Sequence, residues 1–151
     1  MFCREYMTVD PPMLHADDTV ATATRELVDR RQLVLAVVDD SGGYLGLFGV
    51  FDLMALLLPS GAVEGLVPDL GFMADDPAEL RERLGEKGDL AIGAVLDSDL
   101  PVLHPDTPIV EALFLIQKHR TPLAVVEEPS GRLLGLLTHW DALACVRGQE
   151  R

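Results

Sequence analysis

Apolar and polar positions form two different patterns in the first part of the chain. Apolar side chains recur at the spacing of one helix face on Val20, Ala23, Leu27 and Val28. Asp18 or Thr19 precedes this stripe as a candidate N-cap, because both side chains accept hydrogen bonds from the free N–H groups of a first helical turn. Residues 33–38 are continuously apolar and rich in Val and Leu. Such a short run predicts a strand that is buried on both faces.

Turn residues separate this strand from a second one. Residues 40–43 read Asp-Ser-Gly-Gly, a composition that favours a turn, and the partner strand is expected over 44–48. A helix is expected over 52–58, and it ends there because Pro59 cannot continue a helix. A short apolar stretch at 13–15 precedes the first helix, so the predicted unit is β-α-β-β-α.

The same succession returns further along the chain. The matching positions are Leu14-His15 with Leu103-His104, Ala23 with Ala112, Leu35 to Val38 with Leu123 to Val126, Gly46-Leu47 with Gly135-Leu136, and Asp52 with Asp141. The offset is 88 residues in the strand that begins at Leu35 and 89 elsewhere. The single-residue slips therefore fall at a helix end and at a turn, where loops absorb them. The chain therefore contains two copies of one repeated unit.

The second unit shows the same signals as the first. Thr107 is the expected N-cap of its first helix, and Pro108 takes the first helical position, where a missing N–H is harmless. The apolar stripe of this helix is Ile109, Ala112, Leu113 and Ile116. Strands are expected over 123–126 and 133–138, with a turn between them at 129–131. A closing helix is expected over 141–147.

The repeats predict the domain organisation. They are expected to span residues 1–59 and 91–151, with residues 60–90 as an inserted linker. Inside this linker, Asp76 opens a capping box for a short helix that stops at Gly85. A plain connection is favoured over a lid or a contact surface.

Composition and charge exclude several classes of protein. Hydrophobic residues make up 48% of the chain, enough for a packed core. The net charge of −13 repels phosphate backbones, so nucleic-acid binding is disfavoured. No apolar run is long enough to span a membrane and no secretory signal is seen, so a cytoplasmic protein is expected. The two cysteines, Cys3 and Cys145, are expected to be reduced thiols.

The repeated unit resembles the cystathionine-β-synthase (CBS) domain. The segments that carry the resemblance are Leu35 to Asp39, Gly43 to Gly46 and Asp52-Leu53, then Leu123 to Glu127 and Gly131 to Asp141, with Tyr6-Met7-Thr8 in front. The resemblance implies an α+β fold in which two βαββα repeats pack through their sheets as a pseudo-two-fold pair. It also implies clefts between the repeats that bind AMP, ADP, ATP, S-adenosylmethionine or NADH, and pairing into a homodimer.

Thr138 and Asp141 are the strongest candidate ligand residues. They join a strand to a helix N-terminus, where free N–H groups and the helix dipole favour an anion. The Asp141 carboxylate is suited to accept hydrogen bonds from the vicinal hydroxyls of a ribose. In the first repeat Asp52 keeps the carboxylate, but Gly49 replaces the hydroxyl residue, so this site is expected to be weaker. Helix capping without any ligand stays open as the alternative for both aspartates.

The resemblance implies that each repeat holds the base of the ligand bound by the other. For the Asp141 site the implied residues are Met7, Pro12, Leu33 and Val34, and for the Asp52 site they are Leu96, Pro101, Thr121 and Pro122. Ordinary core packing is the alternative for each. Lys118, His119 and Arg120 are the nearest cations for a phosphate, although cations also favour a helix C-terminus on their own. Arg30-Arg31 have the same ambiguity.

Two hypotheses about function remain after the motif search. The histidines at 15, 104, 119 and 139 lack metal-ligand spacing, and no nucleophile or phosphate-loop motif occurs, so neither a metal site nor an enzyme is expected. The first hypothesis is a sensor that binds an adenosine-containing ligand and signals to an effector protein, with no permanent cofactor. The second is a structural dimerisation module with empty clefts.

Overall fold

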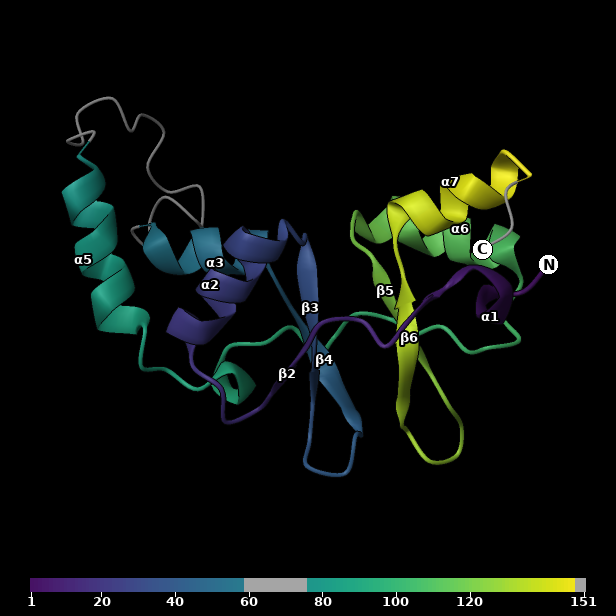
Figure 1. The fold of residues 1–151 in the computed structure, drawn as a ribbon, viewed down its shortest axis with the longest axis horizontal. Coiled ribbons are helices and arrows are strands. Elements are labelled where there is room, and N and C mark those ends of the chain that lie inside the picture. The colour runs from purple at the N-terminus through teal and green to yellow at the C-terminus, as the bar shows by residue number, and fades with distance from the viewer. Residues whose placement is uncertain (59–75, 149–151) are drawn as a thin grey trace.

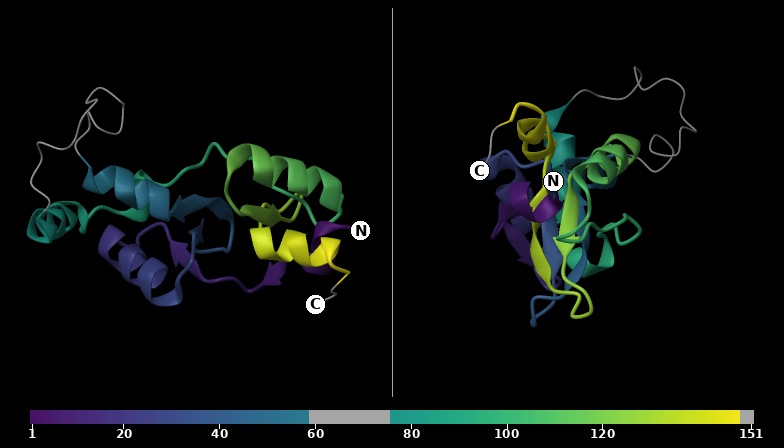
Figure 2. Two further views of the ribbon diagram at one scale, coloured as in Figure 1. Left: turned by 90° about the horizontal axis from the view of Figure 1, so that it is seen from above. Right: turned by 90° about the vertical axis from the view of Figure 1, so that its right-hand side faces the viewer.

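The computed structural model describes residues 1–58 and 76–148 and has two halves side by side, with strands at the centre and helices on the outer flanks (Figures 1 and 2). The helices are α1 (Cys3–Tyr6), α2 (Val20–Arg30), α3 (Val50–Leu57), α5 (Pro77–Lys87), α6 (Ile109–His119) and α7 (His139–Val146), with a 3-10 turn η1 (Ile92–Ala94). The strands are β1 (Thr8–Val9), β2 (Met13–His15), β3 (Val34–Val38), β4 (Tyr44–Gly49), β5 (Leu123–Val126) and β6 (Leu133–Leu137). The α+β fold built from two βαββα repeats is confirmed.

Each half has one sheet, and each sheet takes an edge segment from the chain that precedes the other repeat. The strand orders are β2-β3-β4 and β1-β6-β5. The short strand β1 pairs antiparallel with β6, where Thr8 lies opposite Leu136. In the other half, Asp97 forms an antiparallel bridge with Leu47 of β4. The two halves therefore exchange short segments at the edges of their sheets.

Three apolar cores explain why the strands are apolar without alternation. On β3, Leu35 and Val37 belong to a core with α2, while Val34 and Ala36 belong to a core that also contains Ala124 of β5. The third core packs β5 and β6 against α6, α7 and α1. Because both faces of β3 and β5 are covered, polar side chains have no place on either face.

The predicted elements of the first repeat are confirmed with small shifts at their ends. Thr19 is the N-cap of α2, and its side chain accepts a hydrogen bond from the Thr22 N–H. Val28 is exposed, so it lies off the buried stripe that the spacing predicts. Helix α3 begins at Val50, before the predicted start, because Gly49 already has the extended backbone of an N-cap. Pro59 lies outside the described residues.

In the second repeat the predicted cap of α6 is wrong. Pro108 is the N-cap, and the Thr107 hydroxyl instead accepts a hydrogen bond from the His104 N–H in the preceding turn. The first repeat uses Asp18 in the same way, as acceptor for the His15 N–H. Helix α7 begins at His139, with Thr138 as its N-cap.

The helix of the predicted linker runs further than expected. Asp76 caps α5 as predicted, but the helix passes through Gly85 and ends at Lys87. Tertiary contacts override the glycine, since Gly88, just after the helix, accepts a hydrogen bond from the Ala21 N–H of α2. The Arg83 guanidinium also donates to the Leu57 carbonyl at the end of α3, 3.1 Å away.

None of the described helices combines the length and hydropathy that a bilayer-spanning segment needs. The division into residues 1–59, 60–90 and 91–151 stays a prediction.

Candidate functional site

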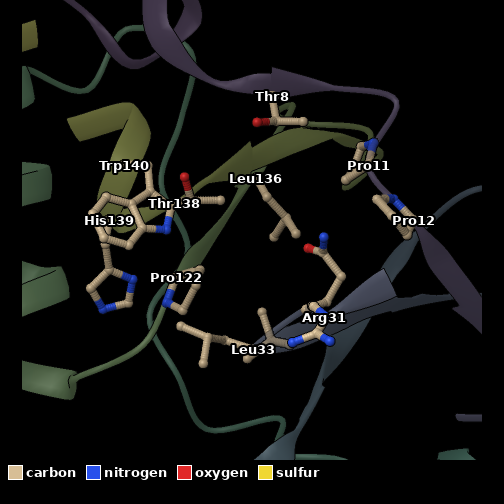
Figure 3. A pocket seen from close by; sticks show the side chains of 12 residues that line it. Thr8, Pro11, Pro12, Arg31, Leu33, Pro122, Leu136, Thr138, His139 and Trp140 are labelled. Atoms are coloured by element: carbon tan, nitrogen blue, oxygen red, sulfur yellow. The ribbon is translucent and has the colours of Figure 1, made fainter. Parts of the chain in front are cut away.

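Two cavities lie where the repeats meet, at the N-terminal ends of α7 and α3. The first, here called the Trp140 cleft, has a volume of about 250 Å³. Its walls are Thr8, Pro11, Pro12, Arg31, Gln32, Leu33, Val34, Pro122, Leu136, Thr138, His139 and Trp140. Figure 3 shows Thr138, His139 and Trp140 on one side of this cleft and Pro11, Pro12 and Arg31 on the other.

The second cavity, here called the Asp52 cleft, has a volume of about 220 Å³. Its walls are Leu33, Val34, Leu47, Gly49, Phe51, Asp52, Asp97, Leu100, His119, Arg120, Thr121 and Pro122. Leu33, Val34 and Pro122 line both clefts. An apolar wall is thus shared between two cavities that lie next to each other.

The two clefts are built from equivalent parts of the repeats. Each cleft places the N-terminus of the last helix of one repeat, α7 or α3, opposite an arginine from the other repeat. Arg31 follows α2 with φ of 51°, and Arg120 follows α6 with φ of 60°, so both are left-handed C-caps. A left-handed cap ends the helix and turns the chain into the next strand. The fold therefore carries one guanidinium to each cleft.

Asp141 does not line the Trp140 cleft, because its side chain is fully buried. The residue is 0% exposed. Its Oδ2 accepts hydrogen bonds from the Thr138 N–H at 2.9 Å and from the Thr8 hydroxyl at 3.0 Å. The Thr138 hydroxyl in turn accepts one from the Asp141 N–H at 3.1 Å. This carboxylate therefore caps α7, and ribose binding by Asp141 stays a prediction.

Asp52 has the same capping bond but faces its cleft. Its Oδ2 accepts a hydrogen bond from the Gly49 N–H at 2.8 Å, and Gly49 supplies no hydroxyl in return. Burial raises the pKa of Asp52 above its ordinary value of 3.8, the bond from Gly49 lowers it in part, and the negative charge of Asp97 raises it. A half-buried carboxylate in a cavity wall is accessible to a ligand hydroxyl.

Thr8 and Asp97 are equivalent positions, 89 residues apart, with different chemistry. Each lies on the segment that crosses to the other sheet, Thr8 opposite Leu136 and Asp97 opposite Leu47. Each is also near the aspartate at position N3 of the closing helix. Thr8 donates a hydrogen bond to Asp141, whereas Asp97 places a second carboxylate beside Asp52.

The structure brings most, but not all, of the predicted ligand residues into the clefts. Those in the walls are Pro12, Leu33, Val34 and Thr138 in the Trp140 cleft, and Asp52, Arg120, Thr121, Pro122, Leu33 and Val34 in the Asp52 cleft. Met7 and Leu96 lie elsewhere, packed against the two helix–sheet cores. Pro101 lines neither cleft, and its neighbour Leu100 lines the Asp52 cleft instead.

Sequence reasoning missed three wall residues that matter for chemistry. Trp140 and Phe51 occupy equivalent positions at the two clefts, and their exposed fractions are 74% and 73%. The recurrence of an aromatic residue at an offset of 89 residues was a usable signal in the sequence. Asp97 gave no such signal, because nothing local to it points to a cleft.

Among the described residues, no group of three or more His, Cys, Asp or Glu side chains is arranged to hold a metal ion. Cys3 and Cys145 are both buried and free.

The comparison with known families agrees with this architecture. The CBS domain model matches the chain twice, over residues 3–59 and 92–148. The chain belongs to the CBS domain family, as the paired repeats and their exchanged edges indicate. A comparison with curated protein sequences found no match.

Solved structures of CBS domain pairs have the same fold. CBSX2 from Arabidopsis thaliana has a TM-score of 0.78 at 20% sequence identity, covering 97% of this chain and 94% of that one. CBSX2 in complex with AMP has a TM-score of 0.73 at 21% identity, covering 97% and 96%. The CBS domain pair of protein MJ0100, in complex with 5′-methylthioadenosine and S-adenosyl-L-methionine, has a TM-score of 0.67 at 15% identity, covering 98% and 97%.

Proposed function

We propose that this protein is a regulatory module, without catalytic activity, that binds an adenosine-containing ligand between its repeats and signals to an effector protein. The observation that carries the proposal is the paired construction of the clefts. Each combines an arginine, a helix N-terminus and an apolar wall, which are partners for the phosphate and the base of a nucleotide. A cytoplasmic location stays a prediction.

We assign the parts of a nucleotide to different residues of the cleft walls. Leu33, Val34 and Pro122 offer apolar surface to an adenine ring from either cleft. In the Asp52 cleft the half-buried carboxylate of Asp52 is suited to ribose hydroxyls. In the Trp140 cleft this role falls to the hydroxyls of Thr8 and Thr138, because Asp141 is buried behind them.

The relatives support this class of ligand. One solved CBS pair contains AMP, and another contains 5′-methylthioadenosine and S-adenosyl-L-methionine. A ligand that favours one arrangement of the two repeats shifts the population that an effector meets.

Thermal unfolding with AMP, ADP, ATP, S-adenosylmethionine and NADH tests the proposal. A ligand that binds only the folded state adds about 2.7 kcal/mol at a hundredfold excess over its dissociation constant. We expect a rise in melting temperature with at least one ligand, reduced in Asp52→Ala or Arg31→Gln. Asp40→Ala, an exposed acid outside both clefts, is the matched control. No shift at millimolar concentration with any of the five would reject the proposal.

A second function, dimerisation, is favoured by apolar side chains left exposed at equivalent positions on two helices. Phe51 and Met54 on α3 are equivalent to Trp140 and Leu143 on α7, and Leu58 and Val146 are also exposed near the ends of these helices. We propose that these stripes support a homodimer. Sedimentation equilibrium tests it: the wild type is expected to be dimeric and Leu143→Asp monomeric, whereas a monomeric wild type would reject this function.

A further inference from the structure

The charged residues of the two clefts differ in number and sign. Among the described residues, the Trp140 cleft has Arg31 and His139 in its wall and no carboxylate. The Asp52 cleft has Arg120 in the place that corresponds to Arg31, and His119, Asp52 and Asp97 also lie in its wall. With both imidazoles neutral, the wall charges sum to one positive in the first cleft and to one negative in the second.

Two carboxylates make this difference: the equivalent of Asp52 is Asp141, which is buried outside the wall of the Trp140 cleft, and Asp97 has no acidic equivalent. Its equivalent in the other cleft is Thr8, whose hydroxyl is neutral and is turned to the buried Asp141 carboxylate. Asp97 is held in place by its own backbone turn, where its Oδ1 accepts a hydrogen bond from the Asp99 N–H at 3.0 Å. The carboxylates of Asp52 and Asp97 line the same cavity; burial raises the pKa of Asp52, and the negative charge of Asp97 raises it further. A phosphate in the Asp52 cleft would therefore face two carboxylates across a small cavity.

We propose that Asp97 is a specificity-determining residue that makes the Asp52 cleft select neutral or cationic adenosine ligands, while the Trp140 cleft selects anionic ones. This inference rests on the proposed function, since it assigns different ligand classes to the same two clefts. Like charges in a partly buried site repel at an effective dielectric constant far below that of water, so one extra carboxylate changes affinity for a phosphate by about tenfold.

The sole tryptophan of the chain allows the two clefts to be followed separately. In the wild type, Trp140 reports on its own cleft. The double variant Trp140→Phe with Phe51→Trp moves the indole to the equivalent, equally exposed position at the Asp52 cleft. Titrating both proteins with AMP and with adenosine, and following the indole fluorescence, gives four affinities.

We expect the wild-type reporter to prefer AMP by about tenfold and the double-variant reporter to prefer adenosine by a similar factor. Adding Asp97→Asn to the double variant should remove that preference for adenosine, because the amide keeps the Oδ1 acceptor without the charge. In the wild-type background, Arg31→Gln should weaken AMP binding and leave adenosine unchanged. Arg30→Gln, a neighbouring exposed arginine outside the cleft wall, should change neither.

The outcomes separate this inference from the proposed function. A preference for AMP at both reporters, or no effect of Asp97→Asn, would overturn the inference and leave the sensor function standing. No response of either reporter to either compound would overturn both. Circular dichroism on each variant checks that the fold is intact.

Discussion

The hydroxyl of Thr8 donates a hydrogen bond of 3.0 Å to the carboxylate of Asp141, across 133 residues of sequence. Thr8 belongs to the N-terminal segment and Asp141 to the last helix, so the bond joins the two ends of the described chain. Together with the Thr138 N–H, it compensates the burial of a carboxylate that has no exposed surface. The bond therefore connects the exchanged edge strand to the helix that borders the Trp140 cleft.

Replacing Thr8 by valine tests this connection. Thr8→Val keeps the shape of the side chain and removes the donor, and hydrogen bonds to charged groups are worth about 1.5–3 kcal/mol. We expect the free energy of unfolding, measured by urea denaturation, to fall by about that amount. Thr8→Ser keeps a hydroxyl and should retain most of the stability. A Thr8→Val protein as stable as the wild type would contradict the role of this bond.

Gly135 and Gly85 allow a controlled comparison, because a side chain has no room at the first and open space at the second. A methyl group on Gly135 would overlap the Thr8 carbonyl oxygen where β1 crosses β6, whereas one on Gly85 meets no atom within 4 Å. Gly135→Ala should lower the free energy of unfolding by about 1–3 kcal/mol, as overpacked sites do. Gly85→Ala, inside α5, should raise it by about 1 kcal/mol. The idea fails if both substitutions have the same sign.

Asp52 gives a dependence of stability on pH. Its pKa is raised in the folded state, so the folded protein holds this proton more tightly than the unfolded chain. The resulting stabilisation is fully present below the ordinary pKa of 3.8 and is lost as pH rises through the raised pKa. Urea denaturation at several pH values should therefore show wild type losing stability relative to Asp52→Asn over this window. A difference independent of pH would contradict the shift.

Cys3 should be unreactive in the folded protein. Burial and the nearby charge of Glu111 raise the pKa of this thiol to about 11, and the side chain is 0% exposed. At pH ~8 only about one molecule in a thousand would be the reactive thiolate. Iodoacetamide labelling followed by peptide mass mapping should detect alkylation of Cys3 in denaturing urea but not under native conditions. Rapid native labelling would show that the N-terminal helix opens readily.

Most of the fold follows from the repeat and from local periodicity. The apolar run that contains Leu35 to Val38, and its copy at Leu123 to Val126, predict the central strands because only a doubly covered strand tolerates such runs. The single-residue slips are also confirmed. Arg31 and Arg120 are equivalent C-caps at an offset of 89, and the strands that follow differ by one residue.

The exchange of edge strands was not predicted, because it depends on contacts between distant residues. Thr8 carries no local signal that it pairs with Leu136. The recurring glycines Gly46 and Gly135 did carry a signal for such a contact, since a glycine inside a strand often marks a close approach of another backbone. Both lie where a crossing segment passes over them.

Cleft residues close to a helix end were predicted correctly from the sequence. The prediction failed for residues whose place in a cleft or a core depends on the direction of the side chain. Thr138 and Arg120 line clefts because caps fix their positions. Met7 and Leu96 point into cores, which depends on the twist and pairing of the crossing segments. The burial of Asp141 likewise depends on Thr8, and no pattern near residue 141 reveals it.

Mapping a ligand by nuclear magnetic resonance tests the central claim most directly, since a chain of 16.4 kDa gives resolved amide spectra. AMP would be titrated into isotope-labelled protein and the shifts of backbone amides followed. The account predicts saturable shifts that cluster on the cleft walls, above all at Thr138 and Trp140 and at Arg31 opposite them. An unchanged spectrum at millimolar AMP, or shifts confined to residues outside both clefts, would contradict it.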